Sequence, residues 1–148
     1  FLLIRRHHGD IELSELPPRE AIAKIANSLF DLFHEHQELA SLLNSENLHK
    51  ARHISNSKTI RGLYRPLLKT LDEVVERGRA EGVFARRISG TDFAISLTGL
   101  AYFYFANRYT LSVVLDEDLQ TAERLERRRA HLVEFVLAYL AAPEGGRK

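Results

Sequence analysis

The stretch LAYFYFANRYTLSVVL, from Leu100 to Leu115, decides how this chain folds. If this stretch is helical, apolar and aromatic side chains cover most of the helix circumference. A helix on a protein surface has instead one apolar and one polar face. A polar pair, Asn107 and Arg108, lies inside the stretch. Such a helix either crosses a membrane or is covered by protein on several sides.

The length of the apolar run separates these two alternatives. The run extends from Phe93 to Ala106, and two charged residues, Asp92 and Arg108, flank it. A membrane span needs about 20 predominantly apolar residues, so this run is too short to cross a bilayer. We therefore expect a helix over about residues 92–115 that other helices cover.

The rest of the chain is also predicted to be helical. Apolar residues recur at three- and four-residue steps, and no segment alternates as a strand does. Pro17 and Pro18 suit a helix start, Pro66 is expected to kink or split its helix, and Gly82 suits a helix end. The fold class is therefore all-α, a bundle of about five to six helices. We expect these at about 17–34, 39–52, 58–81, 92–115 and 119–141.

The last two predicted helices carry more apolar surface than one small domain can cover. Large exposed apolar patches are rare on soluble monomers, so we expect a second copy to cover the excess. Pairing about a two-fold axis gives an intermolecular four-helix bundle. A monomer that buries every aromatic residue in its own core is the alternative. The predicted dimer interface consists of Leu100, Tyr104, Arg108, Leu111, Arg128, His131, Leu132, Phe135, Val136 and Tyr139.

Composition and motifs argue against several other classes of protein. The chain has no cysteine, which excludes disulfides and thiolate chemistry and fits a reducing cytoplasm. Its net charge of +1 gives no strongly basic face for nucleic acid. It contains no nucleophile elbow, Gly-rich phosphate loop or HExxH motif. We therefore expect no enzyme activity and no cofactor.

One pair of histidines has a spacing that metal sites use. His49 and His53 stand four residues apart, and Glu46 lies one helical turn earlier. A solvated histidine face near a helix end explains the same spacing. We predict no metal site and keep His49 and His53 as weak candidates only.

Four segments together carry a resemblance to a known family. They are FHEHQELASLLNSENLHKARH (33–53), ERGRAEGVF (76–84), FYFANRYTLS (103–112) and ERRRAHLVEFVLAYL (126–140). In order and spacing the chain, from about Leu16 to Leu140, resembles the C-terminal regulatory domain of tetracycline-repressor (TetR) family transcription factors. The resemblance implies an all-α domain that dimerises through its last two helices and holds a small-molecule pocket in its core.

The resemblance also implies an N-terminal helix-turn-helix that binds operator DNA. Nothing in residues 1–16 looks like that motif, so the DNA function is expected of the intact protein. Residues 1–15 are then the end of a linker helix, residues 16–142 the ligand-binding and dimerisation domain, and residues 143–148 a flexible tail. In such a family, ligand binding moves the helix that links the pocket to the helix-turn-helix. The spacing of the two helix-turn-helix motifs in the dimer then changes.

The implied pocket needs an apolar cavity with a few converging polar groups. We expect a small, mostly apolar effector to enter between the helices at about 57–81 and 92–115. For each apolar residue, plain core packing is the alternative, and the partner of the Asn107 amide is protein, water or ligand. The candidates are Phe30, Phe33, Leu43, Glu46, Asn47, Tyr64, Leu67, Leu71, Tyr102, Phe103 and Asn107.

The sequence therefore favours the regulatory domain of a TetR-type regulator. A stand-alone helical interaction module and a small-molecule carrier without a DNA role remain alternatives. A helix-turn-helix pattern encoded just upstream would exclude both alternatives, whereas a start codon immediately before Phe1 would exclude the regulator.

Overall fold

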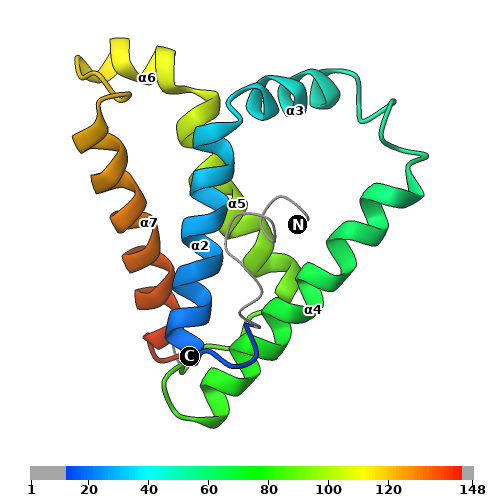
Figure 1. Ribbon diagram of the computed structural model, residues 1–148, viewed down its shortest axis with the longest axis vertical. Helices are drawn as coiled ribbons and strands as arrows, with labels where there is room; N and C mark the ends of the chain where they lie inside the picture. Colours follow the sequence, from blue (N-terminus) through cyan, green and yellow to red (C-terminus); the bar gives the residue numbers. More distant parts are fainter. Residues whose placement is uncertain (1–12, 145–148) are drawn as a thin grey trace.

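The computed structural model describes residues 13–144, and of residues 58–64 it describes only the backbone. Within these residues it contains helices and no strand, which confirms the all-α prediction (Figure 1). The predicted linker helix at 1–15 and the tail at 143–148 fall largely outside the described residues. The helices are α2 (Pro18–Glu35), α3 (Glu38–Leu48), α4 (Lys58–Ala80), α5 (Gly90–Ala106), α6 (Arg108–Leu115) and α7 (Ala122–Ala141).

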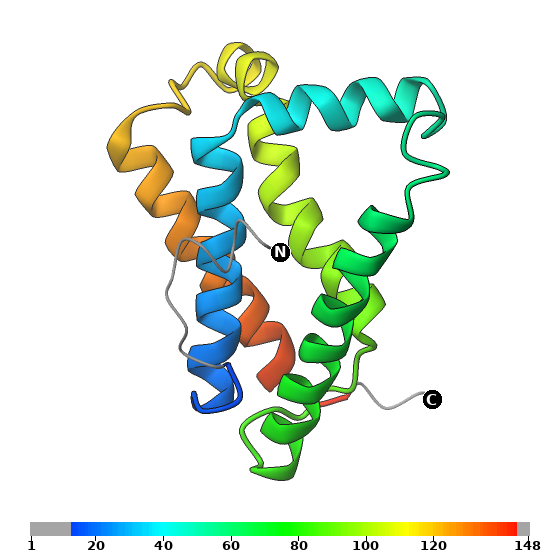
Figure 2. The ribbon, with the colours of Figure 1, turned by 45° about the vertical axis from the view of Figure 1, so that its right-hand side comes forward.

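Helix α2 forms the centre of the bundle and packs against α4, α5 and α7 (Figures 1 and 2). Its apolar residues, spaced three and four apart, put one row of side chains into the core; Ile22, Ala26 and Phe30 are at most 1% exposed. An ion pair adds to its contact with α7, where Arg129 Nη2 donates to Asp31 Oδ2 at 2.6 Å. Helix α2 therefore covers one face of the α5–α7 pair.

The single helix predicted over 92–115 is in fact two helices that meet at Asn107. The Asn107 backbone has φ −112°, and both its backbone N–H and its side-chain Nδ2 donate to the Phe103 carbonyl, at 3.1 and 2.9 Å. An amide side chain that takes a helix carbonyl competes with continuation of the helix. The polar pair inside the apolar stretch is thus where the helix breaks.

Helix α4 continues through Pro66 as one element, so the predicted split does not occur. It ends at Ala80, and Gly82 follows with φ +74°, a left-handed conformation that glycine adopts without steric cost. This confirms Gly82 as the stop signal. None of the helices in residues 13–144 combines the length and the apolar character that a membrane crossing needs.

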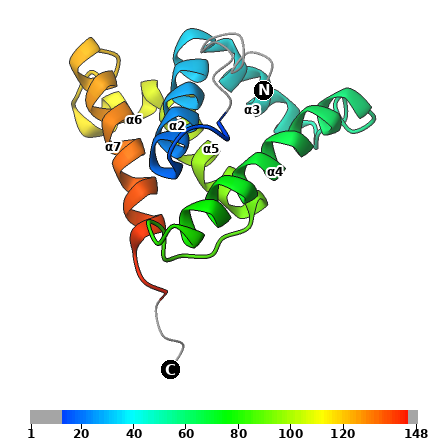
Figure 3. The same ribbon diagram turned by 60° about the horizontal axis from the view of Figure 1, so that its bottom comes forward.

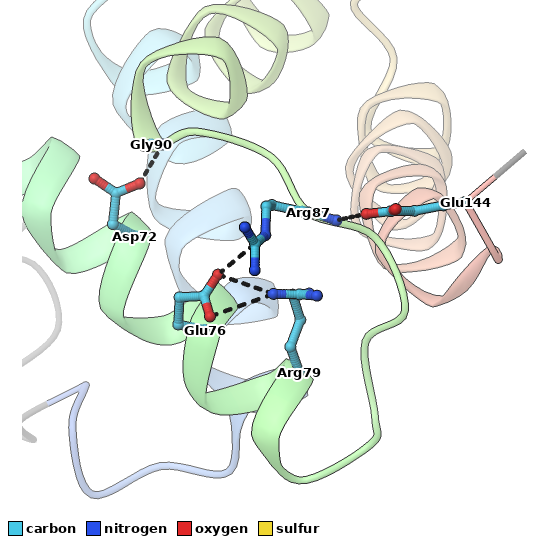
Figure 4. Close-up of polar contacts among 6 residues, drawn as sticks. All are labelled: Asp72, Glu76, Arg79, Arg87, Gly90 and Glu144. Carbon is cyan, nitrogen blue, oxygen red and sulfur yellow. Dashed lines mark hydrogen bonds and ion pairs between the residues drawn. The ribbon is translucent and has the colours of Figure 1, made fainter. Parts of the chain in front are cut away.

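The turn between α4 and α5 is fixed by polar contacts at one end of the bundle (Figure 4). Gly90 N–H donates to Asp72 Oδ1 at 2.5 Å, and Glu76 pairs with Arg79 at 3.1 Å and with Arg87 at 4.0 Å. The backbone N–H groups of Ala85 and Arg86 donate to the carbonyl of Leu140, at 2.9 and 3.0 Å. These bonds attach the turn to the end of α7, which lies beside it (Figure 3).

Candidate functional site

Three of the predicted pocket residues meet in an aromatic cluster between α2 and α5. The ring of Phe33 lies 5.8 Å from that of Tyr102, and Phe30 and Phe33 both pack against Phe105, at 4.9 and 6.4 Å. Phe30 and Phe33 are 1% and 3% exposed. They form the inner part of the core, while Tyr102 is only half-buried.

Three other candidates lie on α3 and α4. Leu43 and Leu67 are half-buried and pack against the core, and Leu71 is fully buried within it. The Tyr102 hydroxyl donates to Asn44 Oδ1, which ties α5 to α3. Helix α3, the 49–57 connection and α4 thus run around one side of α5 (Figure 2). The Tyr64 side chain lies outside what the structure describes.

Glu46, near the end of α3, is a buried carboxylate with one partner. The residue is 9% exposed, and its Oε1 accepts a hydrogen bond from His53 Nδ1 at 2.6 Å. Its Oε2 is buried and has no hydrogen-bond partner. Among the predicted polar pocket residues whose side chains the structure describes, Glu46 alone is buried with an oxygen that has no partner.

The histidine pair does not extend to a metal site. The rings of His49 and His53 lie 5.8 Å apart, but His49 Nδ1 donates to the Ser45 carbonyl at 2.8 Å and His53 Nδ1 to Glu46. Among residues 13–144 no three His, Asp or Glu side chains come together as metal ligands would.

Three other predicted pocket residues lie elsewhere. Phe103 is 57% exposed and points away from the core, and Asn47 is exposed at the end of α3. The Asn107 amide is used within the chain, where it donates to Phe103. A helix turns successive residues by about 100°, so Phe103 faces away from the buried Phe105.

Several residues of the predicted dimer interface are buried in the single chain. Tyr104, Leu132 and Val136 are 5%, 0% and 2% exposed in the single chain, so they have no surface to offer a partner. Leu100 and Leu111 are half-buried and pack against the same core. Arg108 turns back on its own chain, with Nη2 donating to the Tyr109 hydroxyl at 3.2 Å. Part of the predicted interface therefore faces the core of its own protomer.

Arg128 belongs to the joint between α5 and α7. Its Nη2 donates to the Leu100 carbonyl at 2.8 Å, and its guanidinium lies 5.7 Å from the Tyr104 ring centre. Burial lowers the pKa of Arg128 from its usual value and raises the pKa of Tyr104. The residue fixes how the two helices cross within one protomer.

A different set of apolar residues is exposed on α5, α6 and α7, and we call it the exposed apolar face. Along α5, Ile95, Gly99 and Phe103 stand four apart, on the side that α2 does not cover. A Cβ added to Gly99 would meet nothing within 4 Å, so another helix has room to approach there. The large members are Ile95, Phe103, Tyr109, Val113, Val114, Leu115, Phe135 and Tyr139, with exposures from 38% to 81%.

Arg77, on α4, is a polar residue that the sequence did not single out. Its guanidinium donates to the backbone carbonyls of Leu13 at 3.0 Å, Leu16 at 2.7 Å and Ser14. These acceptors lie more than sixty positions earlier in the chain, so no local pattern indicates them. Arg77 fastens the segment that precedes α2 to the last turn of α4.

Comparison with known proteins gives the family. Residues 18–136 match the model of the tetracyclin repressor-like C-terminal domain. The chain belongs to this family. It is also 32% identical over 109 residues to the HTH-type transcriptional repressor NicS of Pseudomonas putida, a match that covers 74% of the chain. The matched region is 51% of NicS, so the chain spans about half the length of that curated relative.

The TetR-like match begins at the first residue of α2 and reaches into α7. It includes the aromatic cluster, Glu46 and nearly all of the exposed apolar face. The chain is thus a TetR-like C-terminal regulatory domain, homologous to a repressor and from a non-enzymatic family. The carbonyls that Arg77 binds lie just before the matched region.

Proposed function

We propose that the chain is the effector-binding and dimerisation domain of a TetR-type transcriptional repressor. Family membership is the observation that carries the proposal. Its relative is named as a helix-turn-helix repressor, and the chain matches only about half of that protein. The intact regulator would bind operator DNA in the cytoplasm, through a helix-turn-helix outside this chain.

Selection of binding sites from random DNA tests this proposal on the intact protein. A symmetric dimer reads two half-sites about one helical turn, or a multiple of it, apart. We therefore expect enrichment of a palindromic sequence with that spacing. If no sequence is enriched, the chain is a module without a DNA role.

The exposed apolar face is the proposed dimer surface. Large apolar patches on a soluble protein mark interaction sites, and a two-fold axis would place α5, α6 and α7 against the same helices of a second copy. Of the residues first expected, His131, Phe135 and Tyr139 remain at this surface. On α5, the exposed Ile95, Gly99 and Phe103 take the place of the buried Tyr104 in the proposed interface.

The proposed effector site lies beside the aromatic cluster, between α3, α4 and α5. The half-buried side chains of Leu43, Leu67 and Tyr102 would supply its apolar and aromatic surface, and Glu46 would supply a polar group. Tyr64 stays a candidate from the sequence. Such a lining suits a mostly apolar molecule that a few polar contacts orient.

Arg77 is the residue that we propose transmits effector binding from this site to the DNA-binding domain. It lies on α4, and the three carbonyls that it holds belong to the segment through which the DNA-binding part would be attached. A guanidinium fork holds several acceptors in fixed geometry, so a movement of α4 would carry the segment with it. An effector that binds one position of α4 better shifts the dimer toward that position.

Arg77→Gln in the intact protein should weaken operator binding about tenfold, because the two DNA-binding domains of the dimer are then held less firmly in position. Fluorescence anisotropy with the selected operator measures the change. Arg79→Gln is the matched control, since Arg79 lies on the same helix and pairs with Glu76 at the surface. If Arg77→Gln and the wild-type protein bind the operator with equal affinity, Arg77 does not couple α4 to the DNA-binding domain.

A further inference from the structure

Positive charge is concentrated in one part of the chain. Of the 20 acidic residues of the chain, none lies between Glu46 and Asp72. The interval holds six of the 21 lysines and arginines, and we call these six residues the basic corner: Lys50, Arg52, Lys58, Arg61, Arg65 and Lys69. The corner thus has a charge of +6, whereas the other 15 cations and the 20 acidic residues give the rest of the chain a charge of −5.

We infer that the basic corner binds the phosphate backbone of duplex DNA without reading its sequence. The inference rests on the proposed function for the choice of partner, and it adds a DNA contact that this chain itself makes. Its basis is a row of exposed cations that the fold leaves largely without acidic partners.

The side chains of the basic corner that the structure describes are exposed. Lys50, Arg52 and Arg65 are exposed and form no ion pair with any residue in the described part of the chain. Lys69 pairs with Glu73 at 3.3 Å, at the end of the corner where acidic residues begin again. Unpaired like charges on one surface repel each other, so this surface favours a partner with many negative charges.

Four positions of the basic corner lie on one face of α4. Residues 58, 61, 65 and 69 are spaced three, four and four apart, which makes them neighbours along the helix surface. The core-facing Leu71 and Val74 lie on the other side of the helix. The row is about 17 Å long, a length of duplex in which one strand carries about five phosphates.

This arrangement lowers the stability of the helix that carries it. The first turn of α4 contains no acidic residue, and it begins with Lys58. The positive end of the helix dipole favours acidic residues there and disfavours cations. The row of cations therefore has no role in stabilising α4, and a negatively charged partner would offset its cost.

Hydrogen bonds within the 49–57 connection fix the part of the corner that precedes α4. The Ala51 N–H donates to the Glu46 carbonyl at 2.7 Å, and His53 Nδ1 donates to Glu46 Oε1 at 2.6 Å. The carboxylate of Glu46 is buried, so it does not cover the cations at the surface. Because the connection is already folded, Lys50 and Arg52 would lose little backbone freedom on binding.

The basic corner lies apart from the exposed apolar face. In Figures 1 and 3, α4 and α7 flank α2 and α5 on opposite sides, and the corner is at the junction of α3 and α4. Pairing through α5, α6 and α7 would therefore leave it free. The proposed function brings the dimer to duplex DNA, and cations that contact phosphates position a protein on DNA without reading the bases.

Fluorescence anisotropy of the 148-residue chain with a labelled duplex of random sequence tests the inference. At about 50 mM salt we expect a Kd of about 10–100 µM. The logarithm of the binding constant should fall with the logarithm of the salt concentration with a slope of about −3 to −5, for about four to five phosphates contacted. Absence of binding, or binding that salt does not weaken, would overturn the inference.

Arg65→Glu should weaken binding of this duplex about tenfold and make the salt slope shallower by about one. The matched control is Arg19→Glu, since Arg19 is exposed at the start of α2, at the opposite end of the bundle (Figure 1). Both variants change the net charge equally, and neither exposed position should alter the thermal midpoint. Equal weakening by the two variants would show that net charge alone acts and would overturn the inference.

Competition with anionic vesicles separates DNA from a membrane surface as the partner. Vesicles of phosphatidylcholine with about 30% phosphatidylserine are added to the bound duplex, at the same total negative charge. We expect the duplex to stay bound. Displacement of the duplex would assign the basic corner to a membrane surface and overturn the inference.

These outcomes are separate from those of the operator selection. The selection is done on the intact protein, whereas the titrations use this chain alone. An enriched operator together with no binding of the random duplex to the chain would keep the repressor and reject the DNA contact of the basic corner.

Discussion

Phe135→Asp is expected to convert the chain from a dimer into a monomer at protein concentrations of tens of micromolar. Phe135 is 52% exposed in the single chain and lies on the exposed apolar face, beside His131 at 6.1 Å between rings. An aspartate there would place an unpaired charge in the interface, at a cost of about 3–5 kcal/mol for each buried charge. Two-fold symmetry introduces the change twice. Size-exclusion chromatography with light scattering measures the result.

Leu42→Asp is the matched control for this substitution. Leu42 is 58% exposed on α3, so the same apolar-to-acidic change is made outside the exposed apolar face. That variant should stay dimeric. If Phe135→Asp also stays dimeric with unchanged stability, the interface lies elsewhere on the molecule.

Gly78→Ala is expected to lower the free energy of unfolding by about 3 kcal/mol, because the added methyl group overpacks the core. A Cβ at Gly78 would lie 2.1 Å from Phe84 Cδ2 and 2.9 Å from Cγ. Phe84 is 3% exposed, so its ring has no free space into which to move. Urea unfolding followed by circular dichroism measures the loss.

The double variant Gly78→Ala/Phe84→Leu shows whether the ring is the cause. Phe84→Leu removes part of the ring that the new methyl group would meet, so Gly78→Ala should cost clearly less in that background. If the two losses simply add, the backbone at Gly78 is responsible and the ring contact is not.

The helices could be predicted from the sequence because their signals are local. Apolar residues at three- and four-residue steps predicted α2 and α7, and Gly82 marked the end of α4. The sequence predicts one continuous helix over 92–115, although the polar pair Asn107 and Arg108 lies where the structure breaks it into α5 and α6. Whether an asparagine ends a helix depends on whether its amide takes a carbonyl, here that of Phe103.

Which side of a helix stays exposed is hard to predict from the sequence, because it depends on distant contacts. The sequence showed that the helix over 92–115 has two apolar sides, but α2, about seventy residues earlier, decides which side is covered. Tyr104 faces it and Phe103 does not. The sequence made Glu46 a candidate polar pocket residue, but its burial and its bond to His53 depend on the path of the 49–57 connection. Arg77 had no local signal at all.

Sedimentation equilibrium of the 148-residue chain tests most directly whether a second copy covers α5, α6 and α7. At tens of micromolar we expect a single species with twice the mass of the 16.9 kDa chain. A species with the mass of one chain at that concentration, folded and stable, would contradict the paired regulator on which the proposal of operator DNA binding depends.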